Sequence, residues 1–408
     1  MQKNSSGRNQ KKERIILLVL GTLIALGPFS IDMYLPAFEN IARDFSITKS
    51  QVGFSLTSYF IGIALGQLAY GPIMDKYGRK KPLLTGLIIY VLAAVSCFYS
   101  PDLNWLIVSR FFLAVGASAG MVASKAVVRD VFPSEEVARA ISFLMLIMGG
   151  APIIAPTVGG IVITHFSWHA IFLILAIFAG LMILSVTFFL PESATPDKSV
   201  ELKLNRVMSK YSGIFINKIF LTFSLAGSLT IGAMFAYISN APVLFMDTYH
   251  LSETEFGWLF GINAAGLIAG SQINRIILKK HSTFRVTLVT SVVLVILAAF
   301  FLLNAIATGN FYITLFLLFA ILFLLGFQNP NTTALSLYPF KRRAGRASAL
   351  VGSLKMILGA VASFVISKFT GVSMLPLAMT ILVCLSLSAF LLFRFQLKEK
   401  RSLILIGR

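Results

Sequence analysis

One acidic residue lies near the middle of a long apolar stretch. Asp32 stands in the segment SIDMYLP, between Pro28 and Pro36. Proline removes a backbone hydrogen bond and bends a helix, so this segment can leave backbone groups free for a ligand or for water. Burial disfavours the charged form of a carboxyl group because that form loses its solvation. Asp32 is therefore a candidate for taking up and releasing a proton, and the alternative is a structural partner for a buried cation.

Three basic residues also lie within apolar stretches. Arg110 begins RFFLAVGASAG, Lys125 follows it near the end of the same stretch, and Lys355 lies in GSLKMILGA. Arginine keeps its charge at any relevant pH, so a nearby Asp32 would stay ionised until a substrate or a conformational change separated the two. The alternative for Arg110 and Lys125 is a long side chain that extends to the membrane surface. For Lys355 the sequence does not choose between the two.

Two further segments combine small residues with proline or charge. The connection GPIMDKYGRKKPL places charges of both signs around a tight turn, and MGGAPIIAPTVGGIV places glycine and proline within an apolar stretch. Small residues let two helices approach closely, and proline bends a helix, although ordinary packing explains the second segment equally well. The residues singled out are Gly71, Asp75, Gly78, Arg79 and Lys80 in the connection, and Pro156, Gly159 and Gly160 in the apolar stretch.

The sequence offers no pattern of an enzyme or a metal site. The histidines lie at the ends of apolar stretches or in connections, without metal-ligand spacing. No Ser-His-Asp order and no nucleotide-binding glycine loop occurs. Cys97 and Cys384 lie in apolar stretches of different halves, which favours neither a disulfide nor a thiolate site. We expect no catalytic residue, no metal and no cofactor, and hence not an enzyme.

The chain that carries these residues is too apolar to bury its hydrophobic side chains in the core of a water-soluble protein. Of the 408 residues, 57% are hydrophobic and only 12% are charged, and the mean hydropathy is +0.85. Lipid must therefore cover much of the chain. The net charge of +19 lies mainly in short connections, which indicates membrane topology and not nucleic-acid binding.

Twelve stretches are long enough to cross a bilayer as helices, which needs about 20 apolar residues each. This predicts an all-α polytopic membrane protein with two six-helix bundles, at 15–190 and 219–394, joined by a linker at 191–218 and flanked by an N-terminal segment, 1–14, and a C-terminal tail, 395–408. The predicted spans are 15–37, 53–74, 82–100, 104–128, 139–164, 168–190, 219–246, 256–278, 285–305, 311–337, 348–367 and 373–394.

Lysine and arginine gather in alternate connections. The opposite connections hold only Arg43, Lys49 and Lys368. Positively charged connections face the cytoplasm, so both termini are expected there.

Taken together, the motifs resemble the major facilitator superfamily, and within it the drug:proton antiporters of the bicyclomycin-resistance type. The connection at 71–83 is similar to the loop signature GxxxDxxGRK, RFFLAVGASAG resembles the basic motif of the fourth helix, and APTVGG resembles the antiporter motif GPxxGG. SIDMYLPAF and the run from Phe235 to Gly270 look like the narrower subfamily. Two positions depart from the pattern: Ala155 replaces a usual glycine, and Asn274 stands at the acid of the second-half loop motif.

The resemblance implies two bundles that rock around a central cavity. Asp75 would lie at the N-terminus of the eleventh helix and lock the outward-open state, while Asp32 exchanges protons and Arg110 modulates that exchange. We expect proton-coupled efflux of small, neutral or weakly charged amphiphilic drugs across the bacterial cytoplasmic membrane. The partners are then the substrate, protons and lipid, without nucleic acid, and the chain is a monomer. Tentative substrate contacts are Tyr34, Tyr59, Gln67, Met121, Phe235, Tyr237, Asn240, Asn329 and Lys355.

Three alternatives remain open at this stage. The first is a nutrient/proton symporter of the same fold, against which only the APTVGG resemblance argues. The second is a proton-coupled exporter of an endogenous metabolite or siderophore, which sequence cannot separate from a drug exporter. The third is a membrane receptor that transports nothing, for which the internal duplication and Asp32 would be superfluous.

Overall fold

The computed structural model describes residues 10–197, 199–200, 202, 211–307, 309–369 and 373–398. Most of the predicted terminal segments 1–14 and 395–408, and part of the 191–218 linker, lie outside these residues. The described chain is helical and contains no strand. Its elements are α1 (Gln10–Asp32), η1 (Leu35–Ala37), α2 (Phe38–Asp44), α3 (Lys49–Tyr77), α4 (Lys80–Phe98), α5 (Leu103–Val131), α6 (Ser134–His165), α7 (His169–Phe189), α9 (Lys218–Pro242), η2 (Val243–Thr248), α10 (Glu253–Ile277), α11 (Thr283–Ala307), α12 (Phe311–Leu337), η3 (Tyr338–Arg343), α13 (Ala344–Ser367) and α14 (Leu375–Lys398).

The prediction of twelve spans is confirmed. Within the described residues, twelve helical stretches are long and apolar enough to cross a membrane. The first combines α1, η1 and α2, the seventh combines α9 and η2, and the tenth runs from α12 into η3. Side-chain caps fix several helix starts: Thr48 and Gln51 form a capping box on α3, and Ser252 and Glu255 form one on α10.

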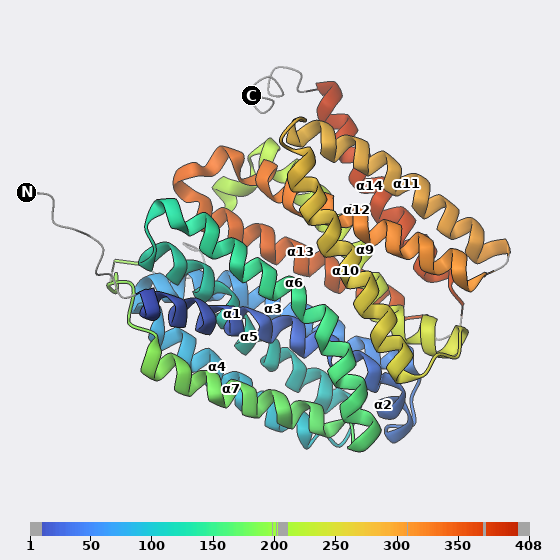
Figure 1. The fold of residues 1–408 in the computed structure, drawn as a ribbon, viewed down its shortest axis with the longest axis horizontal. Coiled ribbons are helices and arrows are strands. Elements are labelled where there is room, and N and C mark those ends of the chain that lie inside the picture. The colour runs from blue at the N-terminus through green and yellow to red at the C-terminus, as the bar shows by residue number, and fades with distance from the viewer. Residues whose placement is uncertain are drawn as a thin grey trace, which may run out of the picture.

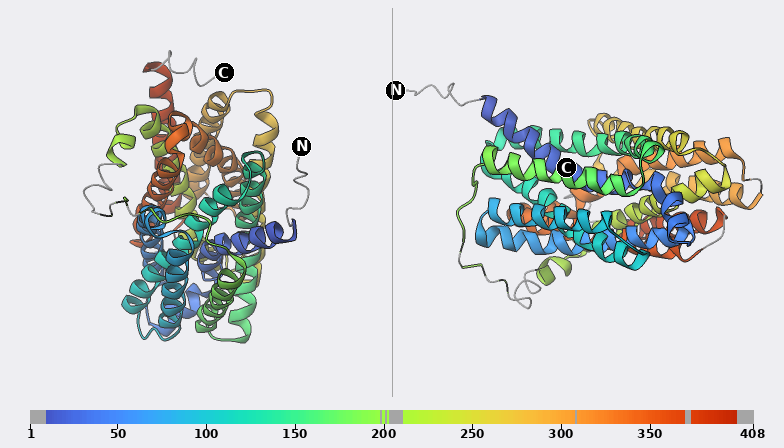
Figure 2. Two further views of the ribbon diagram at one scale, coloured as in Figure 1. Left: turned by 90° about the vertical axis from the view of Figure 1, so that its left-hand side faces the viewer. Right: turned by 90° about the horizontal axis from the view of Figure 1, so that it is seen from below.

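The helices form two bundles, which Figure 1 shows side by side. In the first bundle α1 packs on α5, α6 and α7, while α5 also packs on α3 and α4. In the second, α9 packs on α12, α13 and α14, and α12 also packs on α10 and α11. Figure 2 shows the helices of both bundles running roughly parallel. The bundles meet along two pairs, α3 with α13 and α6 with α10.

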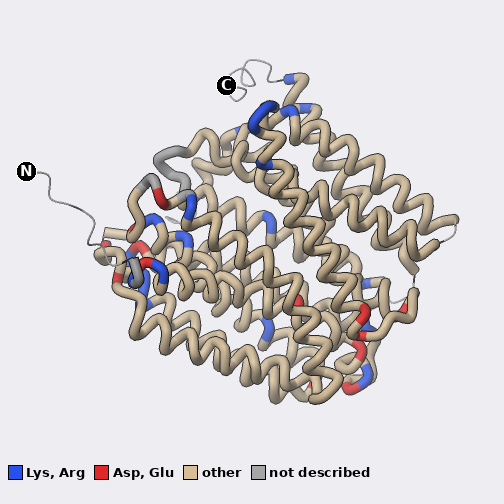
Figure 3. The backbone as a smooth tube through the Cα atoms, in the orientation of Figure 1, with Lys and Arg blue, Asp and Glu red and all other residues tan. Residues whose placement is uncertain are grey.

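Charged residues gather at the two ends of the bundles and are sparse between them (Figure 3). We call "basic end" the end that holds the α3–α4, α5–α6 and α10–α11 connections, and "opposite end" the end that holds the α2–α3 and α9–α10 connections. Because the number of spans is even, both termini of the described chain lie at the basic end.

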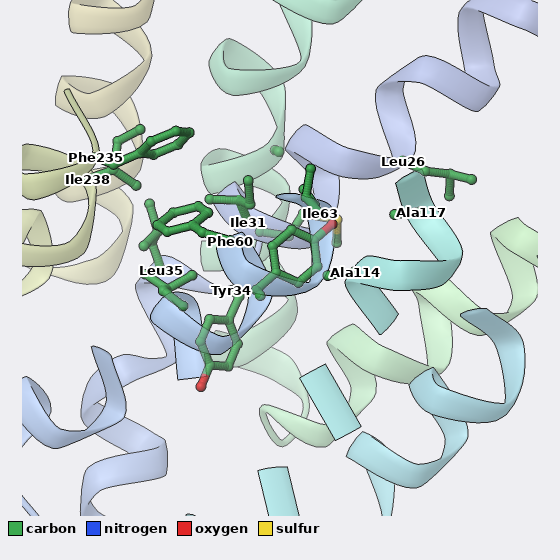
Figure 4. Close-up of a cluster of buried hydrophobic side chains, with 14 of the residues drawn as sticks. Leu26, Ile31, Tyr34, Leu35, Phe60, Ile63, Ala114, Ala117, Phe235 and Ile238 are labelled. Carbon is green, nitrogen blue, oxygen red and sulfur yellow. The ribbon is translucent and has the colours of Figure 1, made fainter. Parts of the chain in front are cut away.

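Apolar and small polar contacts join the bundles in the interior. Phe60 of α3 and Phe235 of α9 pack ring against ring, with their centroids 4.1 Å apart, and Figure 4 shows them facing each other. Thr57 of α3 donates a 3.0 Å hydrogen bond to Ser363 of α13. The central contact between the two halves is thus nearly free of charge.

Candidate functional site

Asp32 lies at a break in the first span. It is the last residue of α1, and the chain then enters η1, which contains Pro36. The side chain is buried, with 3% of the residue exposed. No hydrogen bond or ion pair joins its carboxylate to another described residue. The turn η1, which follows Asp32 in the chain, contacts α6 of the first half and α9 and α10 of the second, so Asp32 lies beside the boundary between the halves.

Arg110 is enclosed within the first bundle and does not extend to a surface. It is fully buried, and its Nη2 donates a 3.1 Å hydrogen bond to the backbone carbonyl of Ser30. The guanidinium carbon lies 4.0 Å from the centroid of the Tyr34 ring and 5.0 Å from that of Tyr59. The ion pair between Arg110 and Asp32 that the sequence allowed is not formed among these residues. Aromatic faces and a carbonyl stabilise this cation instead.

The α3–α4 connection forms a charged network at the basic end. Arg79 pairs with Asp75 at 2.7 Å and with Asp130 of α5 at 2.9 Å. Burial alone would lower the pKa of Arg79, but the hydrogen bonds to Asp130 and Asp75 raise it above its ordinary value. The sequence motif located Arg79 and Asp75 but missed Asp130, whose only signal is an acid at the end of the fourth span.

Glu192, which follows α7, completes this network and was also missed from the sequence. Its carboxylate accepts hydrogen bonds from the backbone N–H groups of Arg79 (2.7 Å) and Lys80 (3.1 Å) at the start of α4. A carboxylate at a helix N-terminus is favoured by the helix dipole. Gly78 has φ +85°, and a Cβ there would lie 2.7 Å from Glu192 Oε2, so only glycine fits this turn.

A cavity of about 400 Å³ lies between the halves at the basic end. Asp75 and Gly345, the latter in the first turn of α13, both line it. The predicted contact of Asp75 with the N-terminus of the eleventh span stays a prediction, and both partners border this cavity. Gln67 and Met121, two predicted substrate contacts, line the same cavity.

The glycines of the APTVGG segment lie where α6 contacts other elements closely. A Cβ on Gly159 would lie 2.2 Å from the backbone oxygen of Met33, directly after Asp32. Gly160 faces the backbone of Glu253 in the second half, and the Pro156 carbonyl faces Gly257 of α10. This segment thus brings α6 close both to the broken first span and to the second bundle.

An ion-pair cluster closes the opposite end across the two halves. Lys49, at the start of α3, contacts Asp247 of η2 in the second half and pairs with Glu39 of α2 at 2.8 Å. The sequence placed Lys49 on this side but assigned it no role. The Lys49 contacts close the opposite end, and the cavity lies at the basic end. The conformation is therefore the one that faces the basic end.

Five of the predicted substrate contacts lie away from the cavity or between the halves. Tyr34 shares a 2.9 Å hydrogen bond with Ser55 inside the first bundle, and Tyr59 donates to the Gly27 carbonyl at 3.3 Å. Tyr237 accepts a 2.9 Å hydrogen bond from the amide of another residue in the second bundle, Asn263. Phe235 packs on the first half as described above, and Asn240 is buried in α9.

The remaining two predicted contacts bind each other. Lys355 Nζ donates hydrogen bonds to Asn329 Oδ1 (2.5 Å) and to Thr333 Oγ1 (2.6 Å) on α12. Within the described residues, no group of histidine, cysteine or acidic side chains could hold a metal ion. The interior therefore offers separate polar positions and no metal centre in this part of the chain.

Comparison with known proteins agrees with this architecture. The chain is 35% identical over 358 residues to the MFS-type transporter YdgK of Bacillus subtilis, covering 86% of this chain and 88% of that one. It is 28% identical to a bicyclomycin resistance protein homolog of Haemophilus influenzae, covering 93% and 95%, and 27% identical to multidrug resistance protein D of Escherichia coli, covering 90% and 92%.

Solved structures show the same fold. A D-xylose-proton symporter superposes with a TM-score of 0.74 at 14% identity, covering 93% of this chain and 97% of that one. A bacterial homolog of the lysosomal transporter Spinster, in an inward-facing and occupied conformation, gives a TM-score of 0.73 at 14% identity, covering 95% and 98%. The sequence profile of the Major Facilitator Superfamily matches residues 18–363. The resemblance seen in the motifs is confirmed, and the chain is a multi-pass membrane transporter that belongs to the Major Facilitator Superfamily.

Proposed function

We propose that this protein exports small amphiphilic, neutral or weakly charged compounds across the bacterial cytoplasmic membrane in exchange for protons. The observation that supports this most directly is Asp32, a buried carboxylate at a helix break beside the contact of η1 with the second half, with which no described basic residue forms a salt bridge. A carboxylate within a membrane is costly and commonly marks an ion or proton pathway. The relatives named for drug resistance favour export of drugs.

The transport cycle alternates between opening at the basic end and opening at the opposite end. With the basic end in the cytoplasm, the present conformation faces inward, and the Lys49 contacts close the outer side. In the outward-facing state Asp75 would approach the N-terminus of α13, where the helix dipole favours an anion. Asp32 would take up a proton from outside and release it inside, while the substrate leaves.

The test uses the purified protein in proteoliposomes under an imposed proton gradient, with chloramphenicol as a neutral probe. We expect chloramphenicol to move against the proton flux in the wild type, and this coupling to be lost in Asp32→Asn. Asp102→Asn is the matched control, because Asp102 caps α5 and asparagine caps a helix as well as aspartate does. Proton movement in the same direction as the probe would identify a symporter, and unchanged coupling in Asp32→Asn would refute the role of Asp32.

A further inference from the structure

A cluster of basic side chains lies within the membrane, between the two halves. Lys355 is near the middle of α13, eleven residues after Ala344 and twelve before Ser367. At 1.5 Å per residue its backbone is about 17 Å from either end of the helix, beyond the reach of a lysine side chain. Its ammonium group instead turns to the interior, where it binds Asn329 and Thr333. Lys355 is thus not a residue that extends to the membrane surface.

A second lysine approaches from the other half. Lys125 of α5 and Gln67 of α3 line the cavity at the basic end, and Gln67 Oε1 lies against Gly352 of α13, one turn before Lys355. Arg129, which is also basic, lines the same cavity as Lys125. Among the described residues no carboxylate pairs with either lysine. Asp75, Arg79 and Asp130 line the same cavity, but the two acids are engaged with Arg79.

The energetics of this cluster favour an anion between the halves. Buried ions are normally stabilised by an opposite charge, since desolvation is costly. The Asn329 and Thr333 oxygens satisfy two donors of the Lys355 ammonium but supply no net charge, and an ammonium carries three donors. Beside Lys125, Met121 and Val122 give the cavity an apolar wall. A site with two cations and an apolar wall matches an amphiphile that carries one negative group.

We propose that Lys355 and Lys125 form a binding site for organic anions, so that weak organic acids are substrates of this transporter. This inference rests on the proposed export function and names its preferred substrate class. The carboxylate or other acidic group lies between the two lysines, and the apolar part lies along Met121. Because each half contributes one lysine, a bound anion removes their repulsion and draws the halves together at the basic end.

The test compares three probes that share one fluorophore: dansylglycine (anionic), dansylglycinamide (neutral) and dansylethylenediamine (cationic). Each is titrated against the full-length purified protein by fluorescence. The wild type is expected to bind dansylglycine at least about tenfold more tightly than the other two, the scale of one charge-assisted hydrogen bond. Lys355→Gln and Lys125→Gln should each remove this preference while keeping their affinity for dansylglycinamide, which also shows that the variants are folded.

Two further variants sharpen the result. Lys355→Arg keeps the positive charge and should retain the preference for dansylglycine. Lys368→Gln is the matched control, because Lys368 lies at the opposite end beside Phe54 and Phe364 and should not affect it. Equal binding of the three probes to the wild type, or a preference that survives in both glutamine variants, would overturn the proposal.

The source of the anion and the export function are tested separately. Titration in chloride and in gluconate separates an organic-anion site from a site for an inorganic counter-ion: a preference that disappears in chloride would overturn the proposal. If the wild type shows no preference for dansylglycine but loses proton-coupled chloramphenicol export in Asp32→Asn, the anion site is refuted and the export function stands. Conversely, tight dansylglycine binding without proton coupling would refute the export mechanism and leave the anion site standing.

Discussion

Lys49 is expected to hold the opposite end of the transporter closed. Its side chain is 13% exposed, against 25% for Asp247 and 48% for Glu39. The arm to Glu39 is largely exposed and contributes between zero and about 1 kcal/mol. The arm to Asp247 crosses the halves and is better shielded, so a charge-assisted hydrogen bond contributes about 1–2 kcal/mol after allowance for solvent. Removing Lys49 should therefore raise the ratio of outward-open to closed molecules by a factor of about 5–30.

The assay measures the distance between the halves at that end. Spin labels at Arg43→Cys and Thr254→Cys, both exposed positions, report the separation of α2 and α10 in a background in which Cys97 and Cys384 are replaced by alanine. The variant Lys49→Gln should move molecules from the short distance to a longer one by the factor given above.

A double-mutant cycle isolates the contact between the halves. Asp247→Asn should open this end about as much as Lys49→Gln, and the double variant should add little, because both changes break one contact. Glu39→Gln should have a smaller effect, since Glu39 lies in the same half as Lys49. Additive effects of Lys49→Gln and Asp247→Asn, or an unchanged distance distribution in Lys49→Gln, would refute the reasoning.

Two further predictions concern packing. Gly159→Ala places a Cβ 2.2 Å from the Met33 oxygen and should destabilise the protein by about 1–3 kcal/mol. Gly150→Ala, where a Cβ meets nothing within 4 Å, should be neutral or slightly stabilising. Equal midpoints of thermal unfolding in detergent for the two variants would contradict this. Asn274 and Asn331 exchange hydrogen bonds of 2.8 and 3.1 Å. Asn274→Asp leaves the Asn331 oxygen without a donor and should lower the free energy of unfolding by about 1–3 kcal/mol, measured in the same assay. A midpoint higher than that of the wild type would show that this position tolerates the acid of the family motif.

The spans could be predicted from the sequence because a bilayer imposes one strong requirement. About 20 apolar residues are needed for each crossing, and hydropathy reports that directly. The structure lengthens most spans at the basic end, for instance to Phe311–Phe340 where 311–337 was predicted, and Lys49–Tyr77 exceeds the predicted 53–74 at both ends. Polar residues such as Lys49 and Lys76 continue the helix into the interface, where water can bind them, and a hydropathy pattern stops before that.

The site was less predictable, since contacts between distant segments carry it. Arg79 binds Asp130, 51 residues later, and Glu192, 113 residues later, and no local spacing indicates either. For Tyr34 the residue type suggested a ligand contact, but its ring lies inside the first bundle against Arg110. A sequence pattern identifies polar residues in a membrane and does not tell which helix face meets the cavity.

Arg110 is expected to act on Asp32 by position and not through its charge alone. α1 ends at Asp32, so the carbonyls of its last turn have no donor from within α1 and carry a partial negative charge, although that of Phe29 accepts from the N–H of Met33. Arg110 donates to the Ser30 carbonyl in that turn while its planar group lies on the Tyr34 ring, an arrangement that fixes the helix end carrying Asp32.

The variant Arg110→Lys separates the effect of charge from the effect of position, because lysine keeps the positive charge but lacks the planar guanidinium group that lies on the Tyr34 ring. If position matters, Arg110→Lys should shift the pH midpoint of chloramphenicol-driven proton movement as far as Arg110→Gln does. Arg43→Lys, at an exposed position, should not shift it. A wild-type pH profile in Arg110→Lys, with a shifted one in Arg110→Gln, would show that charge alone suffices. The end of α1 would then not need the guanidinium of Arg110 as a donor to hold Asp32 in place.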